Sequence, residues 1–224
     1  MNQKNSLGLN KCFLDKIDPI DLFEVWMNEA KKTELNDPNA LALATSDQNN
    51  FPSIRMVLLK DFNKDGFVFY TNLNSQKGNE LKKNPKASMC FHWKSLLRQV
   101  RINGMVQKVS NEVADEYYNS RGYESRIGAW ASKQSTILNN RDELLNSIEE
   151  YKKKYSNKND VPRPEHWSGW NLIPTSIANG VISVDGRRQA SLWHQGAATR
   201  TKACAAAERH PPREQARHDI LPVG

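Results

Sequence analysis

The chain has 224 residues, of which 38% are hydrophobic and 25% are charged, and its formal net charge is +7 at pH 7. A chain of this length and composition can bury one sizeable core, which excludes a wholly disordered protein. Its apolar runs are far shorter than the roughly 20 residues of a membrane span, and it begins without the apolar core of a signal peptide. We therefore expect one soluble, cytoplasmic domain with appended segments and no membrane partner.

The positive charge suits an anionic partner, whether nucleic acid, a membrane surface or a phosphorylated small molecule. Three widely separated cysteines, Cys12, Cys90 and Cys204, offer neither a disulfide framework nor a CxxC pair. The five histidines have no ligand-like spacing, so no metal site is predicted. The sequence also lacks GxGxxG, GxxxxGK[ST] and GxSxG motifs, which disfavours a dinucleotide-binding unit, a P-loop and nucleophilic hydrolysis.

The composition changes abruptly near residue 178. Before it the chain is rich in Asn and prefers Lys to Arg, whereas after it Asn179 and Lys202 are the last of their kinds and Arg dominates. The stretch 203–217 is small, polar and interrupted by two prolines, with no helical or strand period. We interpret 178–224 as a disordered or non-native tail, with a genuine linker or interaction tail as the alternative, and 1–17 as a flexible N-terminal segment.

Residues 18–177 carry the patterns of regular structure. Asp18 and Pro19 are an N-cap and a first-turn proline, and the apolar residues that follow recur at helical spacing. Short strands separated by turn-forming residues come next, and Asn103-Gly104 indicates either a turn or a bulge within one long strand. The expected strands are 40–46, 53–60, 67–71, 87–93, 99–109 and 170–177, and the later helices are 111–121, 126–131 and 141–155.

Closely spaced strands without a helix between each pair favour an antiparallel meander or barrel over a doubly wound parallel sheet. The fold class is therefore mainly β, with antiparallel strands and flanking α-helices.

Three groups of residues could bind a ligand. Arg55 and Lys60 flank an apolar strand whose edge could meet a flat polar ring, although an odd separation places them on opposite faces. A helix expected to begin at Ser75 could hold phosphate at its N-terminus beside Lys77. Tyr117, Arg121 and the following Ser125 could bind a phosphate ester. Each group alone is also compatible with a purely structural role, as are Gln99, Gln134 and Ser135.

Taken in order, these segments resemble the pyridoxine/pyridoxamine 5′-phosphate oxidase family of FMN-binding split β-barrel flavoproteins. The resemblance runs from about Asp18 to Ile177. The matching phrases are Asp37–Ala40, Arg55–Lys60, Phe69–Asn72, Ser75–Lys77, Arg98–Val100, Ser120–Arg121, Ile127–Trp130, Ser132–Ser135 and Trp167–Gly169.

The resemblance implies a homodimer with two FMN sites at the subunit interface, which oxidises pyridoxamine or pyridoxine 5′-phosphate to pyridoxal 5′-phosphate and passes the electrons to O2, giving H2O2. It implies substrate contacts from Lys60, Tyr117, Arg121 and Ser125, with Gln99 reaching the flavin of the partner subunit. It assigns no catalytic side chain, since hydride removal is the flavin's chemistry. The implied FMN contacts are Arg55, Met56, Val57, Leu58, Leu59, Lys60, Tyr70, Thr71, Gln76, Lys77, Gln99, Gln134 and Ser135.

The sequence departs from the family in two places. Gln76 stands where many members have Arg, and after Ile177 a Glu-Phe-Trp segment and an Arg-Leu-His stretch are replaced by Ala178-Asn179-Gly180 and unrelated residues. We therefore expect the fold and much of the FMN site to be kept, with turnover weakened. Two alternatives remain: a flavin- or pyridoxal-phosphate-binding module without oxidase activity, and a basic nucleic-acid binder, for which stacking motifs and a basic helix are lacking.

Overall fold

The computed structural model describes residues 18–138, 140–182, 188–194 and 201–204. The predicted N-terminal segment 1–17 lies outside the described residues, as does most of the predicted tail beyond Ile182.

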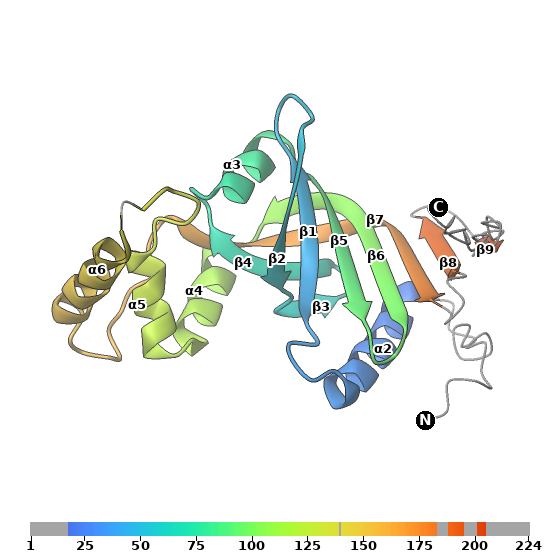
Figure 1. The fold of residues 1–224 in the computed structure, drawn as a ribbon, viewed down its shortest axis with the longest axis horizontal. Coiled ribbons are helices and arrows are strands. Elements are labelled where there is room, and N and C mark those ends of the chain that lie inside the picture. Colours follow the sequence, from blue (N-terminus) through green and yellow to red (C-terminus); the bar gives the residue numbers. More distant parts are fainter. Residues whose placement is uncertain (1–17, 139, 183–187, 195–200, 205–224) are drawn as a thin grey trace, which may run out of the picture.

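Within the described residues one nine-stranded sheet organises the fold, and every strand pairing there is antiparallel (Figure 1). Seven strands follow the order β2-β1-β5-β6-β7-β4-β3, and β8 and β9 continue from β7. This confirms the predicted antiparallel class. The strands are β1 (Ala40–Ser46), β2 (Pro52–Leu58), β3 (Asp61–Asn63), β4 (Gly66–Asn72), β5 (Lys86–Trp93), β6 (Arg98–Lys108), β7 (Trp167–Ile182), β8 (Arg188–His194) and β9 (Thr201–Cys204).

The sheet curls into a half-open barrel. Although β2 and β4 are far apart in the strand order, they contact each other, and the Lys60 N–H that follows β2 donates to Val68 O of β4 over 2.9 Å. The short strand β3, which the sequence pattern did not predict, lies beyond this closure and pairs with the start of β4. The two edges therefore meet only near Lys60 and leave the rest of the β2 edge unpaired.

The core fills the inside of the curled sheet and is covered by α2 (Pro19–Thr33). Asp18 caps this helix as predicted, accepting from the Ile20 N–H over 2.8 Å. The helix buries the predicted apolar face, and the Phe23 ring packs against Phe62, Phe67 and Phe91 with centroids 4.9 to 5.2 Å away. Strand β1 alternates, so that Leu41 and Leu43 point inward and its alanines point outward.

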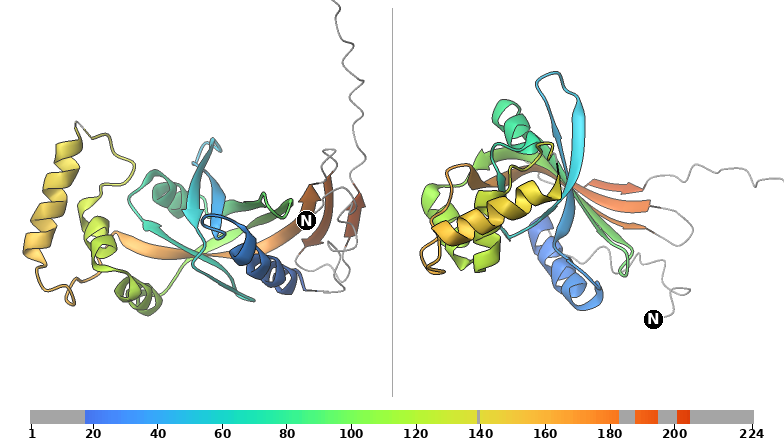
Figure 2. Two further views of the ribbon diagram at one scale, coloured as in Figure 1. Left: turned by 60° about the horizontal axis from the view of Figure 1, so that its bottom comes forward. Right: turned by 60° about the vertical axis from the view of Figure 1, so that its left-hand side comes forward.

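The other helices flank the sheet away from α2. Helix α3 (Gln76–Lys83) lies at the opposite end from α2, and α4 (Asn111–Ser120), α5 (Tyr123–Ala131) and α6 (Arg141–Lys154) gather at one side (Figures 1 and 2). The apolar residues of α6 are only half buried against α5, and Leu145 is exposed. None of the helices in these ranges is long and apolar enough to cross a membrane.

Two long strands join the halves of the barrel. Strand β6 runs continuously through Asn103 and Gly104, so this pair is not a turn; the register against β7 shifts at this point and leaves Thr175 of β7 as the extra residue of a bulge. A Cβ at Gly104 would lie 2.1 Å from Ile173 O, so only glycine fits. Strand β7 is longer than predicted, because backbone pairing with β6 continues through Val181. Residues 178–182, 188–194 and 201–204 of the predicted tail lie in strands.

Candidate functional site

A pocket of about 720 Å³ opens where the β2 edge faces β4, the start of α3 and the α4–α5 turn. It lies at the gap in the barrel, because the sheet edges meet only near Lys60. Its volume is in the range of small-molecule sites. The pocket is lined by Ser53, Ile54, Arg55, Met56, Val57, Leu58, Lys60, Tyr70, Thr71, Gln76, Lys77, Tyr117, Arg121, Gly122, Ser125, Gln134, Ser135 and Trp167.

The edge strand β2 forms one wall of the pocket. Its side chains alternate between half-buried and exposed, and only its β1 side is hydrogen-bonded within the sheet. Arg55 and Lys60, which an odd separation would place on opposite faces of one strand, both line the pocket. The reason is that β2 ends at Leu58 and the chain turns toward β4 before Lys60. An unpaired strand edge flanked by two cations can bind a flat polar ring that carries an anionic group.

The N-terminus of α3 forms a second wall. Ser75 caps the helix as predicted, and the Lys77 side chain is almost fully buried. Lys77 Nζ donates to Gln134 Oε1 over 2.9 Å, and Thr71 Oγ1 donates to the same oxygen over 3.2 Å. Burial, assisted by the Arg55 charge and opposed by Glu80, lowers the pKa of Lys77 to about 8. A helix N-terminus with a buried ammonium favours phosphate binding.

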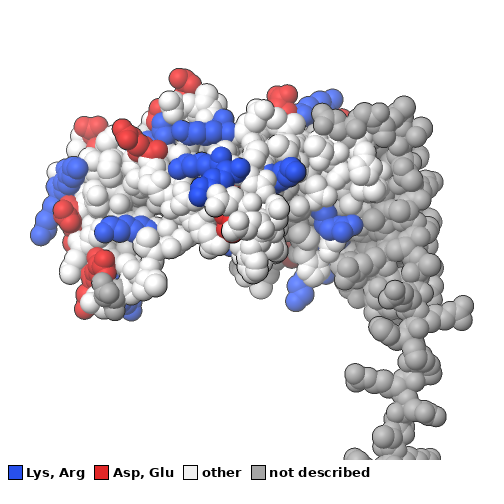
Figure 3. Space-filling model, turned by 90° about the horizontal axis from the view of Figure 1, so that it is seen from above, with Lys and Arg blue, Asp and Glu red and all other residues white. Residues whose placement is uncertain are grey.

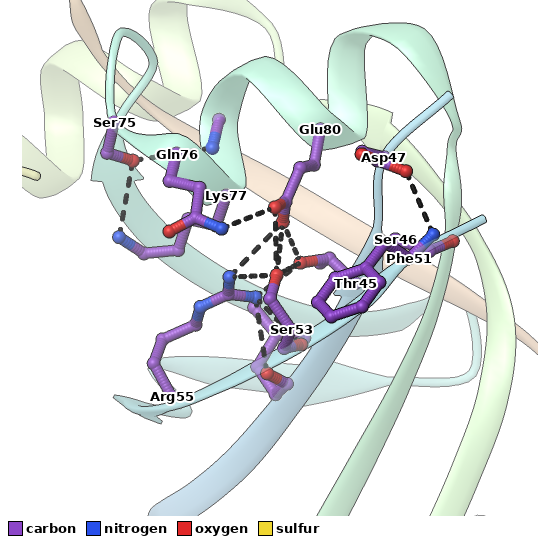
Figure 4. A network of polar contacts seen from close by, with 12 residues as sticks. Thr45, Ser46, Asp47, Phe51, Ser53, Arg55, Ser75, Gln76, Lys77 and Glu80 are labelled. Carbon is purple, nitrogen blue, oxygen red and sulfur yellow. Dashed lines mark hydrogen bonds and ion pairs between the residues drawn. The ribbon is translucent and has the colours of Figure 1, made fainter. Parts of the chain in front are cut away.

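Glu80, one turn further along α3, lies behind this wall and is 7% exposed (Figure 4). Its carboxylate accepts hydrogen bonds from Ser53 Oγ and Gln76 Nε2 over 2.8 Å, from Arg55 Nη2 over 3.1 Å, and from Thr45 Oγ1. Burial raises its pKa, but these hydrogen bonds and the Arg55 charge outweigh burial, so the pKa is lowered. The ionised carboxylate therefore holds three side chains that line the pocket, Ser53, Arg55 and Gln76.

Aromatic rings form the third wall. The Tyr70 ring is nearly parallel to those of Tyr117 and Trp167, with centroids 4.1 and 5.1 Å away. The Arg121 guanidinium lies over Trp167, its Cζ atom 4.8 Å from the ring centroid, and its Nη1 atom is buried without a hydrogen-bond partner among the described residues. Burial raises the pKa of Tyr70 to about 12 and lowers that of Arg121. A half-buried guanidinium with one buried, unsatisfied nitrogen is suited to an anionic ligand.

The structure brings together all the predicted site residues except Leu59 and Gln99. Leu59 is 4% exposed and packs in the core. Gln99 lies on β6 between His92 and Gly180 and does not line this pocket. Ser135, in the loop after α5, has a φ of 66°, a left-handed conformation that residues other than glycine seldom adopt.

Sequence reasoning missed five residues of the site. Ser53, Ile54, Gly122 and Trp167 line the pocket, and Glu80 supports it. Glu80 follows Gln76 by four residues, so helical spacing alone placed both on one face. Trp167 had no such local signal, because β4 brings it to the pocket from a distant part of the chain.

The pocket is strongly cationic. Arg55, Lys60, Lys77 and Arg121 line it, and no Asp or Glu is among the described residues that do so. On the face seen in Figure 3, Lys and Arg side chains gather near the middle, with Asp and Glu mostly toward the edges. Arg55, Lys60 and Lys77 belong to the β2–α3 walls and Arg121 to the aromatic wall, so the site can bind more than one anionic group.

Comparison with known proteins agrees with this geometry. Residues 27–155 match the family model described as pyridoxamine 5′-phosphate oxidase. The chain is 97% identical over 177 residues to a pyridoxine/pyridoxamine 5′-phosphate oxidase of Pelagibacter ubique, covering 79% of this chain and 85% of that protein. It is 55% identical over 165 residues to the protein of the same name from Allorhizobium ampelinum, covering 74% of this chain and 80% of that protein.

Solved structures show the same fold. PhzG from Burkholderia lata, in complex with tetrahydrophenazine-1-carboxylic acid, superposes with a TM-score of 0.78 at 24% identity, over 85% of this chain and 94% of that one. An FMN-binding protein from Nostoc punctiforme is described as related to pyridoxamine 5′-phosphate oxidase. It superposes with a TM-score of 0.66 at 14% identity, over 86% of this chain and 100% of that one. These are split-barrel proteins, which confirms the predicted fold class. From the family match and the identity to these relatives, the chain belongs to the pyridoxamine 5′-phosphate oxidase family.

Proposed function

We propose that this chain is an FMN-dependent pyridoxine/pyridoxamine 5′-phosphate oxidase that makes pyridoxal 5′-phosphate. The observation that carries the proposal is a single pocket with two separate cationic groups. Arg55 and Lys77 lie on the β2–α3 walls, and Arg121 lies on the aromatic wall. Two phosphate esters, one on the cofactor and one on the substrate, require this separation of charge. The names of the close relatives support the same activity.

The residues present fit FMN. The unpaired β2 edge from Arg55 to Leu58 offers backbone donors and acceptors to the edge of a flat ring system. The α3 N-terminus, Lys77 and Arg55 suit the cofactor phosphate, with Gln76, Thr71, Gln134 and Ser135 as hydrogen-bonding groups beside them. Bound FMN supplies the hydride acceptor and returns the electrons to O2. The protein's task is to bind, orient and exclude water.

The substrate phosphate is proposed to bind Arg121, Tyr117 and Ser125, with Lys60 near the ring of the substrate. In this reaction the substrate carbon loses a hydride and its heteroatom a proton. Pyridoxine 5′-phosphate then becomes the aldehyde directly, whereas pyridoxamine 5′-phosphate becomes an imine that water hydrolyses to the aldehyde and ammonia. O2 takes up the two electrons and two protons as H2O2. No side-chain nucleophile is required.

We also propose a homodimer. The outward face of β2 exposes Ile54 and Met56, whose side chains are 70% and 65% exposed, next to the outward-facing alanines of β1. A contiguous apolar face of this kind is typical of a protein interface. In a dimer Gln99 of one subunit would complete the pocket of the other. The widely separated, odd-numbered cysteines suit a reducing compartment, so we place the protein in the cytoplasm.

Weakened turnover remains part of the proposal. Ala178, Asn179 and Gly180 continue β7 in register with β6, so the backbone path is kept while the Glu-Phe-Trp side chains expected from the resemblance are absent. Gly180 lies opposite Gln99, which is the residue that we expect to reach the flavin of the partner subunit. Cofactor binding depends mainly on residues before Ile177. We therefore expect the altered residues to lower the rate of substrate oxidation more than the affinity for FMN.

An absorbance spectrum of the purified protein, followed by anaerobic addition of pyridoxamine 5′-phosphate, tests the proposal. We expect bound yellow flavin that bleaches on addition of substrate, more slowly than in the Pelagibacter relative. Flavin that stays oxidised would support the alternative of a flavin-binding module without oxidase activity. A protein that takes up no FMN would contradict the proposal.

A further inference from the structure

The Arg121 side chain is held by aromatic faces. Its Cζ atom lies 4.8 Å from the Trp167 ring centroid and 5.8 Å from that of Tyr118, and its Nη1 atom is buried without a hydrogen-bond partner among the described residues. Stacking on a ring uses the face of the guanidinium and leaves its N–H donors, which lie in the plane, free. The aromatic rings therefore orient Arg121 while its N–H donors stay available to bind an anion.

Trp167 is itself firmly fixed. It is the first residue of β7, pairs with Asn72 of β4 and is 6% exposed. Its backbone N–H donates to Pro164 O over 2.9 Å, and its backbone carbonyl accepts from Arg163 Nη1 over the same distance. Its ring stacks on Tyr70 with an interplanar angle of 10° and meets Tyr118 edge to face. Backbone pairing and ring contacts together restrain the indole.

We propose that Trp167 is a positioning residue, whose ring holds the Arg121 guanidinium in the orientation that binds the substrate phosphate. The inference rests on the proposed function and deepens it, because it names the residue that controls recognition of the phosphate ester. Arg121 follows directly after α4 as its C-cap, so no helical turn restrains its long side chain. Without the indole face, the guanidinium would lose its orientation to rotamer freedom.

Trp170 provides a matched control. It is a tryptophan on the same strand with the same exposed fraction, 6%, and it does not line the pocket. Replacing either indole removes a similar buried area, so a merely structural role predicts similar results for both. A positioning role predicts a defect specific to phosphate esters for Trp167 alone.

The experiment measures binding of pyridoxal 5′-phosphate and of pyridoxal, which lacks the phosphate, to the FMN-loaded protein and its variants. We expect Trp167→Leu to weaken binding of the phosphate ester about tenfold, the size of a partly desolvated cation–π contact, and to leave pyridoxal binding within about twofold. The KM for pyridoxamine 5′-phosphate should rise much more than kcat falls. Trp167→Phe, which keeps an aromatic face, should restore most of the loss, and Trp170→Leu should show no preference between the two ligands.

The outcomes separate this inference from the proposed function. If Trp167→Leu and Trp170→Leu change the ratio of the two affinities equally, or if Trp167→Phe is as defective as Trp167→Leu, Trp167 is only a packing residue and the inference is wrong. Should Trp167→Leu fail to fold, Trp167→Met compared with Trp170→Met decides in the same way, because methionine keeps much of the side-chain volume but offers no aromatic face. A wild-type protein that binds FMN but does not prefer the phosphate ester would instead contradict the proposed substrate.

Discussion

Arg55 Nη2 lies 3.1 Å from Glu80 Oε2, which ties a cation of the pocket to a carboxylate behind it (Figure 4). The two side chains come from β2 and α3 and are 21% and 8% exposed. Ser53 donates to the same carboxylate, and Gln76 joins it from the pocket side. The ion pair therefore fixes the relative position of two walls of the site.

Removal of Glu80 should destabilise the fold. Glu80→Ala leaves Arg55 without its partner in a largely buried place, which should lower the free energy of unfolding by about 3 kcal/mol. The double variant Arg55→Met with Glu80→Leu should be more stable than Glu80→Ala, because no buried charge is left unpaired. Urea unfolding at pH 7 measures the free energy of unfolding of the single and the double variant, with Lys82→Ala on the exposed side of α3 as the control. A double variant less stable than Glu80→Ala would contradict this account.

FMN affinity should fall as the pH rises through about 8. The pKa of Lys77 is lowered to about 8, chiefly by burial, so the free protein loses this charge near that pH and the phosphate loses a cation. The dissociation constant of FMN, measured by quenching of flavin fluorescence from pH 6 to 10, should rise above pH 8 by up to about tenfold per pH unit. Riboflavin, which lacks the phosphate, should show no such dependence.

Lys77→Arg is the control for this pH dependence, because arginine keeps its charge throughout the range. Its FMN affinity should be nearly constant up to pH 10, and a Lys77→Arg variant that follows the wild-type curve would assign the dependence to another group. The cofactor-free protein should show the opposite trend in stability. Between about pH 8 and the usual lysine value of 10.5 the unfolded chain binds more protons, so the free energy of unfolding should rise with pH.

Asn179→Val should stabilise the protein. Asn179 is 3% exposed on β7, and neither atom of its side-chain amide has a hydrogen-bond partner among the described residues. An unsatisfied buried polar group costs about 1 to 3 kcal/mol, and valine also suits a strand opposite Val100. Thermal unfolding should show a higher midpoint, whereas Gln107→Val, exposed on β6, should change it little. An unchanged midpoint for Asn179→Val would indicate that this amide is satisfied in solution.

Ala44→Glu should weaken the proposed dimer. Ala44 lies on the outward face of β1, between Ile54 of β2 and Ser88 of β5, and does not line the pocket. A carboxylate in the centre of an apolar interface has to be desolvated, which should raise the dimer dissociation constant at least about tenfold. Sedimentation velocity over a concentration series measures this. A variant that dimerises like the wild type would place the interface on another face.

The sequence alone determined most of the elements and the residue types of the site. Local signals identified the Asp18 cap and apolar face of α2, the strand at 40–46 and the start of α3 at Ser75, because each depends on residues a few positions apart. The resemblance to the family, carried by ordered phrases between Asp18 and Ile177, placed eleven of thirteen predicted cofactor residues and all four predicted substrate residues at one pocket.

Only the tertiary structure decided how these residues meet. It ended β2 at Leu58 and turned the chain to β4, which brought Arg55 and Lys60 to one pocket. It also placed Glu80 beneath Arg55, put Trp167 under Arg121, and continued β7 past Ile177. The physical reason is the separation along the chain of the residues that each interaction joins. Caps and alternation act between neighbours in the chain, whereas ion pairs, ring stacking and strand length depend on segments that only the curled sheet brings together.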